Sequence, residues 1–448
     1  MSVYYDVVVI GGSAAGVTAA VTARRFGPGK SICLVRKEEK VSIPCGIPYI
    51  FGTVGSPEKN LLPDTLLTGN GVDLKVSGVS GIDPKTHEVA LSSGERLEYG
   101  KLILATGSTP IVPRIPGVEK QNVFSVKKDV PYLADLLEKV RGARNIVVVG
   151  GGFIGVEFAE ECRKNGAEVS IVEMLPHCLM LTYDEEFCVM AEDALRAQGI
   201  QLYTGETASA ILGGDSVEAV KLASGREVPA DIVVLGIGVS PNTDLAKDAG
   251  LAIGPGRGIQ VDRYMQTSDD DIYACGDCAE KYSFFGGKPS TLRLASIATM
   301  EARIAGANAC GAHRENPGVI GVFSTVLGGT AFSAAGLNEK VAKELGFSVV
   351  TGQAEAVNRH PGSMPGATNL RVKLVFDKAS EILLGGEIAG ALSGGELINA
   401  VSVCIYQRMT ASQMATLQVG THPALTASPV AYQLVNAAEQ ALMKTRAS

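Results

Sequence analysis

The chain carries little charge and no basic excess. Charged residues make up 19% of its 448 residues, and the formal net charge is −7 at pH 7. A surface that binds nucleic acid needs clustered Lys and Arg, so this balance argues against DNA or RNA as the main partner. Any anionic ligand must be held by local basic groups.

Long uninterrupted apolar runs are also lacking. Residues 7–23 are apolar, but Gly11, Gly12 and Gly16 interrupt them, which predicts a strand, a turn and a buried helix rather than a membrane span. No basic segment followed by an apolar one stands at the start of the sequence, so we expect no targeting signal. These features predict a cytoplasmic protein without a membrane partner.

Cysteines are few and form no framework. There are nine, an odd number without regular spacing, which is typical of reduced cytoplasmic thiols. Cys275 and Cys278 have the spacing of a metal-binding pair, but no second pair of ligands follows, so no metal site is predicted. The remaining cysteines apart from Cys45 are interpreted as core or incidental residues: Cys33, Cys162, Cys178, Cys188, Cys310 and Cys404.

What the sequence does contain is a duplicated strand–turn–helix pattern. The length predicts two or three domains, and 53 glycines fit a backbone that approaches ligands closely. A Val-rich run at 5–10 ends at Gly11, and a helix at 14–26 and a strand at 31–35 follow. The same order returns with a strand at 145–149 and a glycine turn at 150–155. This order predicts two βαβ units that each bind a dinucleotide.

The pattern changes after about residue 320. Strand-like runs at 349–357, 370–376 and 381–388 precede helix-like runs at 394–408 and 427–443. This order is typical of an α+β domain. The predicted fold class is therefore α/β, with two Rossmann-like dinucleotide-binding domains and a C-terminal α+β domain.

The second glycine motif is complete, with Gly150, Gly152 and Gly155. Glu173 lies 23 residues after Gly150, at the tip of the next strand. A carboxylate there binds a ribose 2′-hydroxyl and repels a 2′-phosphate, so NADH is favoured and NADPH stays possible. The alternative for the glycines is tight packing of helix against strand.

The first motif has Gly11 and Gly16, with Ser13 in place of the middle glycine. Arg36 stands where a ribose carboxylate is expected, so Arg36, Lys37 and Glu38 are candidate adenosine contacts or, alternatively, a solvated charge cluster. Asp277 closes a strand at 271–276, where a carboxylate either faces a ligand or caps the next helix.

Together these motifs resemble the pyridine nucleotide–disulfide oxidoreductases over nearly the whole chain. The chain is most similar to the single-cysteine branch, which includes coenzyme A-disulfide reductases, NADH-dependent persulfide or polysulfide reductases, NADH oxidases and NADH peroxidases. The segments that carry the resemblance are Cys45-Gly46-Ile47-Pro48-Tyr49, Leu104-Ala105-Thr106-Gly107, Gly238-Val239-Ser240-Pro241-Asn242 and Ile272-Tyr273-Ala274-Cys275-Gly276-Asp277.

The resemblance implies a domain order and a set of cofactor contacts. It implies an FAD-binding domain at 1–115 and 245–320, an NAD(H)-binding domain at 116–244, a C-terminal dimerisation domain at 321–448 and a homodimer. The implied contacts of tightly bound FAD are Gly11, Ser13, Ala14, Ala15, Gly16, Arg36, Lys37, Glu38, Ala105, Thr106, Gly107, Asp277 and Ala295. Those of NADH are Gly150, Gly152, Phe153, Ile154, Gly155, Glu157, Glu173 and Gly238.

Cys45 is the implied redox residue, although an isolated cysteine is more often a buried apolar thiol. Positions 40 and 50 are Lys and Ile, so the second cysteine of dithiol members is missing. His422 matches a catalytic histidine that the other subunit supplies in dithiol members. Its usual glutamate partner is Ala427 here, so catalytic and structural roles both stay open.

Three further substrate contacts are candidates. Arg24 and Arg25 end the first helix and either meet the phosphates of coenzyme A or interact with the helix C-terminus. Tyr49 either lines a substrate channel or packs in the core. Glu157 either faces the nicotinamide or flavin, or lies on an exposed helix face.

The leading hypothesis is an FAD enzyme that uses NADH to reduce coenzyme A disulfide, coenzyme A persulfide or polysulfide through Cys45. The alternative enzyme is an NADH oxidase or NADH peroxidase that cycles Cys45 through a sulfenic acid. A third class is an electron-transfer or redox-sensing flavoprotein that acts through a protein partner.

Overall fold

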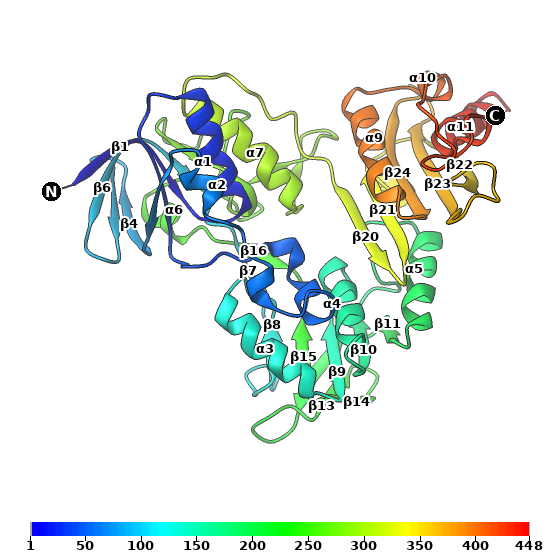
Figure 1. Cartoon of the computed structure of the whole chain (residues 1–448), viewed down its shortest axis with the longest axis horizontal. Helices are drawn as coiled ribbons and strands as arrows, with labels where there is room; N and C mark the ends of the chain where they lie inside the picture. Colours follow the sequence, from blue (N-terminus) through cyan, green and yellow to red (C-terminus); the bar gives the residue numbers. More distant parts are fainter. Residues whose placement is uncertain (1, 448) are drawn as a thin grey trace. The chain divides into compact units, whose positions relative to one another are not determined.

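The computed structural model describes residues 2–447 and divides into two compact units. Unit 1 comprises Met1–Pro113, Phe124–Gly142 and Ile237–Val319. Unit 2 comprises Arg114–Val123, Ala143–Gly236 and Ile320–Ser448. The order of their elements can be followed in Figure 1. The division into three domains with the boundaries given above stays a prediction.

Unit 1 is built on a seven-stranded sheet in the order β3-β2-β1-β6-β5-β4, in which β17 also pairs with β6. Strands β2, β1, β6 and β17 run parallel, as expected for apolar strands that are buried on both faces. The elements of unit 1 are β1 (Val3–Ile10), α1 (Ala14–Phe26), β2 (Ile32–Arg36), α2 (Thr65–Thr68), β3 (Asp73–Val76), β4 (Val79–Asp83), β5 (Glu88–Leu91), β6 (Arg96–Leu104), β7 (Ser108–Pro110), α3 (Val130–Gly142), β16 (Val239–Pro241), α6 (Asp244–Asp248), β17 (Ile272–Ala274), β18 (Lys281–Tyr282), β19 (Pro289–Ser290) and α7 (Ala295–Asn308).

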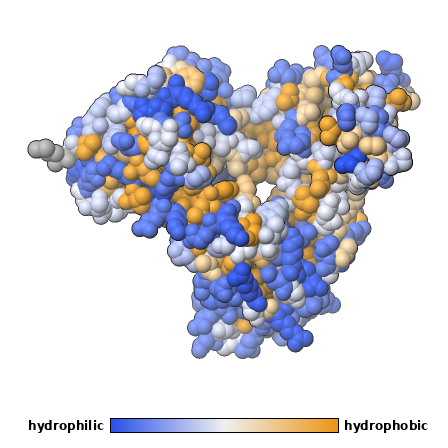
Figure 2. All heavy atoms as spheres, viewed as in Figure 1, coloured by the Kyte–Doolittle hydropathy of each residue, from blue (hydrophilic) through white to orange (hydrophobic). Residues whose placement is uncertain are grey.

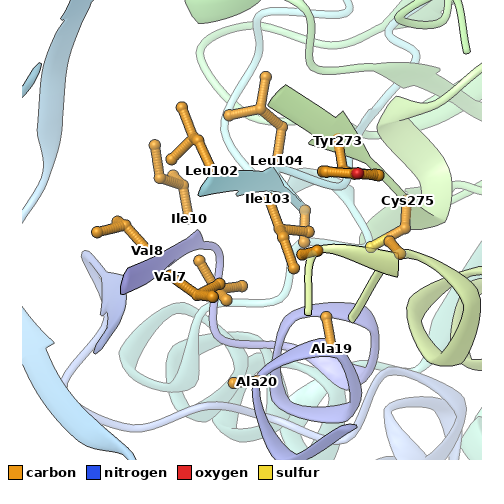
Figure 3. Packing of buried hydrophobic residues seen from close by; sticks show 14 of the residues in the cluster. Val7, Val8, Ile10, Ala19, Ala20, Leu102, Ile103, Leu104, Tyr273 and Cys275 are labelled. Carbon is orange, nitrogen blue, oxygen red and sulfur yellow. The ribbon is translucent and has the colours of Figure 1, made fainter. Parts of the chain in front are cut away.

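The core of unit 1 lies between this sheet and helices α1 and α7. Figure 3 shows apolar side chains of β1 and β6, such as Val7 and Ile103, gathered beside the small residues of α1. Gly306 of α7 lets the two helices approach closely, since a Cβ on it would lie 2.4 Å from the Ala19 carbonyl oxygen of α1. This packing aligns the strand ends that carry the glycine turn and Asp277.

Unit 2 holds a parallel run β11-β10-β9-β15, an antiparallel sheet β12-β13-β14 and an antiparallel sheet β20-β21-β24-β23-β22. Strand β8 (Val123–Ser125) contains a boundary between the units. The elements of unit 2 are β9 (Asn145–Val149), α4 (Phe153–Arg163), β10 (Glu168–Glu173), α5 (Glu185–Ala197), β11 (Gln201–Thr204), β12 (Ala208–Leu212), β13 (Ala219–Leu222), β14 (Glu227–Pro229), β15 (Ile232–Leu235), β20 (Val322–Leu327), β21 (Thr330–Gly336), α8 (Glu339–Glu344), β22 (Val349–Val357), β23 (Asn369–Asp377), β24 (Leu383–Gly390), α9 (Gly394–Tyr406), α10 (Ala411–Ala415) and α11 (Gln433–Ala447).

The α/β fold class is confirmed, but one predicted helix began in the wrong place. The run at 427–443 was expected to be helical throughout, whereas α11 starts only at Gln433 and a short 3-10 turn occupies Pro429–Ala431. Proline lacks an N–H and biases the residue before it toward extended backbone, which delays the helix. Strands β20 and β21 were not predicted from the sequence.

The visible surface is uneven in character. Figure 2 shows that hydrophilic side chains predominate on the visible face around α3, β13 and β14. Large apolar side chains are exposed in the C-terminal region, where Leu425 is 70% and Val430 is 86% exposed. Within residues 2–447, no helix combines the length and the apolar character needed to cross a membrane.

Candidate active site

The first glycine turn joins β1 to α1 and requires glycine at two positions. Gly11 has a φ of +119°, and a Cβ there would lie 2.1 Å from the carbonyl oxygen of Ala105. A Cβ on Gly16 would lie 1.8 Å from the oxygen of Gly11. Ser13 is the N-cap of α1, and its side chain finds no cap partner among the described residues. The first-turn N–H groups, Ala14 and Ala15 included, therefore fit the pyrophosphate of a dinucleotide.

Arg36 ends β2 and is buried at 4% exposure. Its guanidinium donates to the two carboxylate oxygens of Asp64 at 2.6 and 3.0 Å, and to the carbonyls of Glu38 and Glu39 at 2.8 and 2.7 Å. This bidentate pair orders the loop after β2. Lys37 Nζ lies 3.8 Å from Glu38 on the surface. An adenosine contact by Arg36, Lys37 or Glu38 stays a prediction.

Asp277 follows β17 on a tight turn. Ser108 Oγ donates to Asp277 Oδ2 at 2.7 Å, and Lys128 Nζ lies 3.7 Å from the same oxygen. Arg293 Nε donates to the Asp277 carbonyl oxygen at 3.2 Å. Gly276 has a φ of +76°, and its Cβ would lie 2.7 Å from Ala15 Cβ. The Asp277 turn and the first glycine turn therefore lie side by side, and the sequence had indicated neither Ser108 nor Lys128.

Two motifs that are distant in the sequence meet at Thr106 and Asn242. Thr106 Oγ1 donates to the Asn242 carbonyl oxygen at 2.7 Å, and Asn242 Nδ2 donates to the Thr106 carbonyl oxygen at 2.9 Å. The Asn242 N–H donates to the Gly107 carbonyl oxygen at 3.0 Å. Gly238, which has a φ of +105°, begins the second of these segments. Three hydrogen bonds thus fix two loops that are predicted to contact cofactors.

Cys45 lies in a 3-10 turn, Pro44–Gly46, with an exposed side chain. The buried side chain of Asn60 stabilises this turn by hydrogen bonds to the two residues that precede it. Its Nδ2 donates to Ser42 Oγ at 3.0 Å and to the Ile43 carbonyl oxygen at 2.9 Å. A Cβ on Gly46 would lie 2.0 Å from Asn60 Oδ1. The thiol is therefore carried by a rigid turn in which Gly46 has no room for a side chain.

The other cysteines have a different environment. Seven of the nine are buried and Cys310 is partly buried, which leaves Cys45 as the exposed thiol. Burial raises the pKa of Cys33 and of Cys178 to about 12, because the thiolate is poorly solvated there. A thiolate is the reactive form of cysteine, so these buried side chains are poor nucleophiles.

The second glycine turn repeats the geometry of the first in unit 2. Gly150 has a φ of +112°, and a Cβ on Gly155 would lie 1.9 Å from the Gly150 oxygen. Apart from its neighbours in the chain, no described residue has an atom within 4 Å of the point that a Cβ on Gly152 would occupy. The turn thus packs tightly on its helix side and is open at its middle glycine. This arrangement fits a second pyrophosphate.

Glu173 ends β10 beside this turn and is 8% exposed. Its Oε2 accepts from the Gly151 N–H at 2.5 Å, and its Oε1 accepts from the Leu175 N–H at 2.7 Å. Backbone N–H groups thus hold both oxygens of the carboxylate in one orientation. The geometry is that of a fixed acceptor next to the dinucleotide turn, and the ribose contact stays a prediction.

Phe153 and Glu157 lie on α4 and contact strand β20. The rings of Phe153 and Phe323 are stacked with centroids 5.0 Å apart. Thr325 Oγ1 donates to Glu157 Oε1 at 2.8 Å. Burial raises the pKa of Glu157 to about 7, and the hydrogen bond from Thr325 acts in the opposite direction. Glu157 is partly buried, so it does not lie on an exposed helix face, which was the alternative interpretation of this residue. Ile154, also on α4, is 39% exposed.

His422 lies in an exposed loop of unit 2 with a local partner. The ring Nδ1 of His422 accepts from the Ala424 N–H at 3.2 Å. The backbone N–H of His422 donates to Thr426 Oγ1 at 3.0 Å. His360 Nδ1 lies 3.1 Å from the Thr426 carbonyl oxygen, and the His360 N–H donates to the Pro423 carbonyl oxygen at 3.1 Å. These contacts order the loop without the glutamate that the resemblance would supply.

The candidate substrate contacts differ in their exposure and in their hydrogen bonds. Arg24 Nη1 donates to the carbonyls of Pro28 and Lys30 at 3.1 and 2.7 Å, so its guanidinium supports the end of α1. Arg25 is exposed, and Tyr49 is partly buried in the 3-10 turn Pro48–Phe51. Ala295 is the first residue of α7. Substrate roles for these residues stay predictions.

The residues that sequence reasoning missed are partners from elsewhere in the chain. Asp64 binds Arg36, Thr325 binds Glu157, and Asn60 binds the backbone of Ile43 two residues before Cys45, yet none of the three stands in a recognisable motif. No local sequence pattern marks these partners, because only the tertiary structure brings them next to the site residues.

Comparison with known proteins agrees with this geometry. Residues 5–302 match the family model described as pyridine nucleotide-disulphide oxidoreductase, and residues 322–431 match the dimerisation domain of the same family. An NADH oxidase of Methanocaldococcus jannaschii is 31% identical over 98% of both chains. An NAD(P)H coenzyme A polysulfide/persulfide reductase of Pyrococcus horikoshii is 32% identical over 86% of this chain and 87% of its own length.

Solved structures extend the likeness to the fold. An NAD-dependent persulfide reductase from A. fulgidus superposes with a TM-score of 0.92 at 31% identity, covering 98% of this chain and 84% of that one. Reduced CoADR-RHD of Bacillus anthracis gives a TM-score of 0.92 at 28% identity, covering 99% of this chain and 81% of that one.

Proposed function

Because the chain belongs to the pyridine nucleotide-disulphide oxidoreductase family, a family of flavin- and NAD(P)H-dependent enzymes, we propose that it uses NADH to reduce coenzyme A disulfide, coenzyme A persulfide or polysulfide. The observation that carries this proposal is the exposed Cys45 on a turn held by Asn60, while the other cysteines are wholly or partly buried. The names of the P. horikoshii and A. fulgidus relatives support the substrate class.

The proposal assigns FAD to unit 1 and NADH to the second glycine turn. FAD bound there would supply two-electron transfer between reduced nicotinamide and sulfur. The residues that would hold FAD are those of the first glycine turn, the Thr106 loop and the Asp277 turn. Glu173 would accept a hydrogen bond from the ribose 2′-hydroxyl and so favour NADH over NADPH.

Cys45 would act as the nucleophile toward the sulfur substrate. Its thiolate attacks one sulfur of the disulfide, a bond forms between that sulfur and Cys45, and the S–S bond of the substrate breaks. The other half of the substrate leaves as a thiolate, so charge and electrons balance. Arg25 and Arg24 are the basic groups proposed to meet the coenzyme A phosphates, and Tyr49 is proposed to line the approach to Cys45.

A homodimer is part of the proposal, since residues 322–431 match a dimerisation domain. The exposed Leu425 and Val430 are apolar side chains that a second copy could cover. His422 would then serve Cys45 of the other subunit by positioning or hydrogen-bonding the sulfur substrate.

A second candidate function is reduction of O₂ or peroxide, because the M. jannaschii relative with 98% coverage is an NADH oxidase. In that case the Cys45 thiolate would attack one oxygen of peroxide. An S–O bond forms as the O–O bond breaks, hydroxide leaves, and Cys45 becomes a sulfenic acid. Purified protein loaded with FAD separates the two: NADH consumption is compared with coenzyme A disulfide, a persulfide, peroxide and O₂. Disulfide reduction that survives in Cys45→Ser would contradict the proposed mechanism.

A further inference from the structure

A buried ion pair lies directly behind the turn that carries Asp277. Lys281 Nζ lies 2.7 Å from Glu301 Oε2, and the two side chains are 1% and 0% exposed. Lys281 begins β18 and Glu301 lies in α7. Charged side chains are almost never fully buried unless they are paired, so this pair calls for an explanation.

Both members of the pair bind the backbone of Gly276, the residue before Asp277. The Gly276 N–H donates to Glu301 Oε2 at 2.9 Å, and Lys281 Nζ donates to the Gly276 carbonyl oxygen at 2.5 Å. Lys281 Nζ also donates to the Ala279 carbonyl oxygen at 3.2 Å. One ion pair therefore holds both backbone polar groups of Gly276.

The segment after Asp277 is held from a second direction. Glu280 is 2% exposed, and its Oε1 and Oε2 accept from the N–H groups of Gly256 and Gly258 at 2.8 and 2.9 Å. A Cβ on Gly256 would lie 2.5 Å from Glu280 Oε1, so this loop fits closely around the carboxylate. Asp277 consequently stands between two anchored backbone segments.

Net stabilisation is a poor explanation for the Lys281–Glu301 pair. Removing two charges from water often costs as much as their attraction returns. Within residues 2–447, Glu301 Oε1 is also buried without a hydrogen-bond partner. Burial raises the pKa of Glu301, although Lys281 acts in the opposite direction. The pair is therefore better explained by the geometry that it imposes on Gly276, whose turn lies directly against Ala15 of the first glycine turn.

We propose that Lys281 and Glu301 are positioning residues that hold the Gly276 backbone so that Asp277 can bind the flavin half of FAD. The first glycine turn would bind the ADP half through its own N–H groups, because the hydrogen bonds of Lys281 and Glu301 go to Gly276, Ala279 and each other and not to that turn. This inference rests on the proposed function, since it takes FAD as the ligand of unit 1.

The test uses full-length apoprotein reconstituted with FAD. Lys281→Met/Glu301→Gln removes both charges but keeps an oxygen for the Gly276 N–H, whereas Lys281→Met/Glu301→Leu removes both contacts. FAD affinity is measured by quenching of flavin fluorescence, and ADP affinity at the same site by competition with FAD. Lys373→Met is the matched control, because Lys373 is 4% exposed and lies 2.8 Å from both Asp184 and Glu186 in unit 2.

We expect FAD affinity to fall about tenfold in the Met/Gln variant and about a hundredfold in the Met/Leu variant, as one and then both of the hydrogen bonds to Gly276 are lost. ADP affinity should stay within about twofold of the parent protein, and Lys373→Met should leave both affinities unchanged. Each double variant is first checked for a folded apoprotein by circular dichroism.

Four results would overturn the proposal. They are parental FAD affinity in the Met/Leu variant, an equal loss of ADP and FAD affinity, the same loss in Lys373→Met, and unfolding of both double-variant apoproteins. If the unaltered protein binds ADP but no FAD, the proposed function itself has failed, and that result is read from the parent alone.

Discussion

Thr325 Oγ1 donates a hydrogen bond of 2.8 Å to Glu157 Oε1, which joins strand β20 of the C-terminal sheet to the helix that follows the second glycine turn. Burial raises the pKa of Glu157 to about 7, and this hydrogen bond limits the rise by favouring the carboxylate. The protonation state of Glu157 therefore changes near neutral pH.

We predict that Thr325→Val shifts the pH dependence of NADH-linked turnover to higher pH. Loss of a hydrogen bond of about 1.5–3 kcal/mol to the carboxylate raises the pKa of Glu157 and moves the corresponding limb upward by about one to two pH units. Glu157 then stays neutral at pH values where the parent is ionised. The measurement is a profile of kcat/KM for NADH from pH 5 to 9.

Glu157→Gln is the control for this shift, because it removes the ionisation and should remove the corresponding limb of the profile. Profiles of both variants that coincide with that of the parent would show that Glu157 does not govern the NADH reaction.

Glu173→Ala tests coenzyme choice. The variant loses an acceptor whose two oxygens are oriented by Gly151 and Leu175. Since a hydrogen bond to a charged group contributes about 1.5–3 kcal/mol, KM for NADH should rise about tenfold to a hundredfold. KM for NADPH should rise less or fall, because the repulsion of a 2′-phosphate is gone. Equal changes for NADH and NADPH would exclude a role for Glu173 in discrimination.

Gly46→Ala tests the support of Cys45. Its new Cβ would lie 2.0 Å from Asn60 Oδ1, so the Cys45 turn or Asn60 must move. We expect disulfide reduction to fall at least about tenfold, which is 1.4 kcal/mol of lost transition-state positioning. Turnover and the rate of thiol alkylation at Cys45 are measured together.

Gly29→Ala is the matched control for Gly46→Ala, since no described atom lies within 4 Å of its added Cβ. Gly29→Ala should behave as the parent does. If Gly46→Ala also retains parental turnover and alkylation, the tight turn is not needed for the chemistry.

Mixed dimers test whether His422 serves the other subunit. Cys45→Ser and His422→Ala chains are coexpressed with different tags, and the heterodimer is purified. If each site combines Cys45 of one chain with His422 of the other, one of the two sites is intact and about half of the parental activity returns. If both residues come from one chain, the heterodimer is inactive. A fully active His422→Ala homodimer would assign the histidine a structural role.

Much of the framework could be read from local patterns. Two Val-rich strands, each followed by a glycine turn and a helix, were predicted at 5–10 and 145–149. The first lies within β1 and the second coincides with β9. Such patterns are local because a buried parallel strand needs consecutive apolar residues, and the turn needs glycine at fixed offsets. The helix at 427–443 was misjudged because its apolar spacing extends across Pro429, which disfavours helical backbone at Ser428. The chain is extended again at Tyr432, after the 3-10 turn, so α11 begins only at Gln433.

The residues of the candidate site also fall into two groups, those that the sequence predicted and those that only the structure identified. Cys45, Glu173 and Asp277 could be named from the sequence. Glu173 was identified by its distance from the second glycine turn, whereas the roles of Cys45 and Asp277 follow from the resemblance of their segments to family motifs. The partners that hold Cys45 and Asp277 could not be named. Asn60, Ser108 and Glu301 bind these residues or their neighbouring backbone from positions that no spacing rule connects to them. Short sequence motifs thus identify the reactive groups. Their orientation is decided only by the tertiary structure, because distant segments must fold together to satisfy one another's buried polar groups.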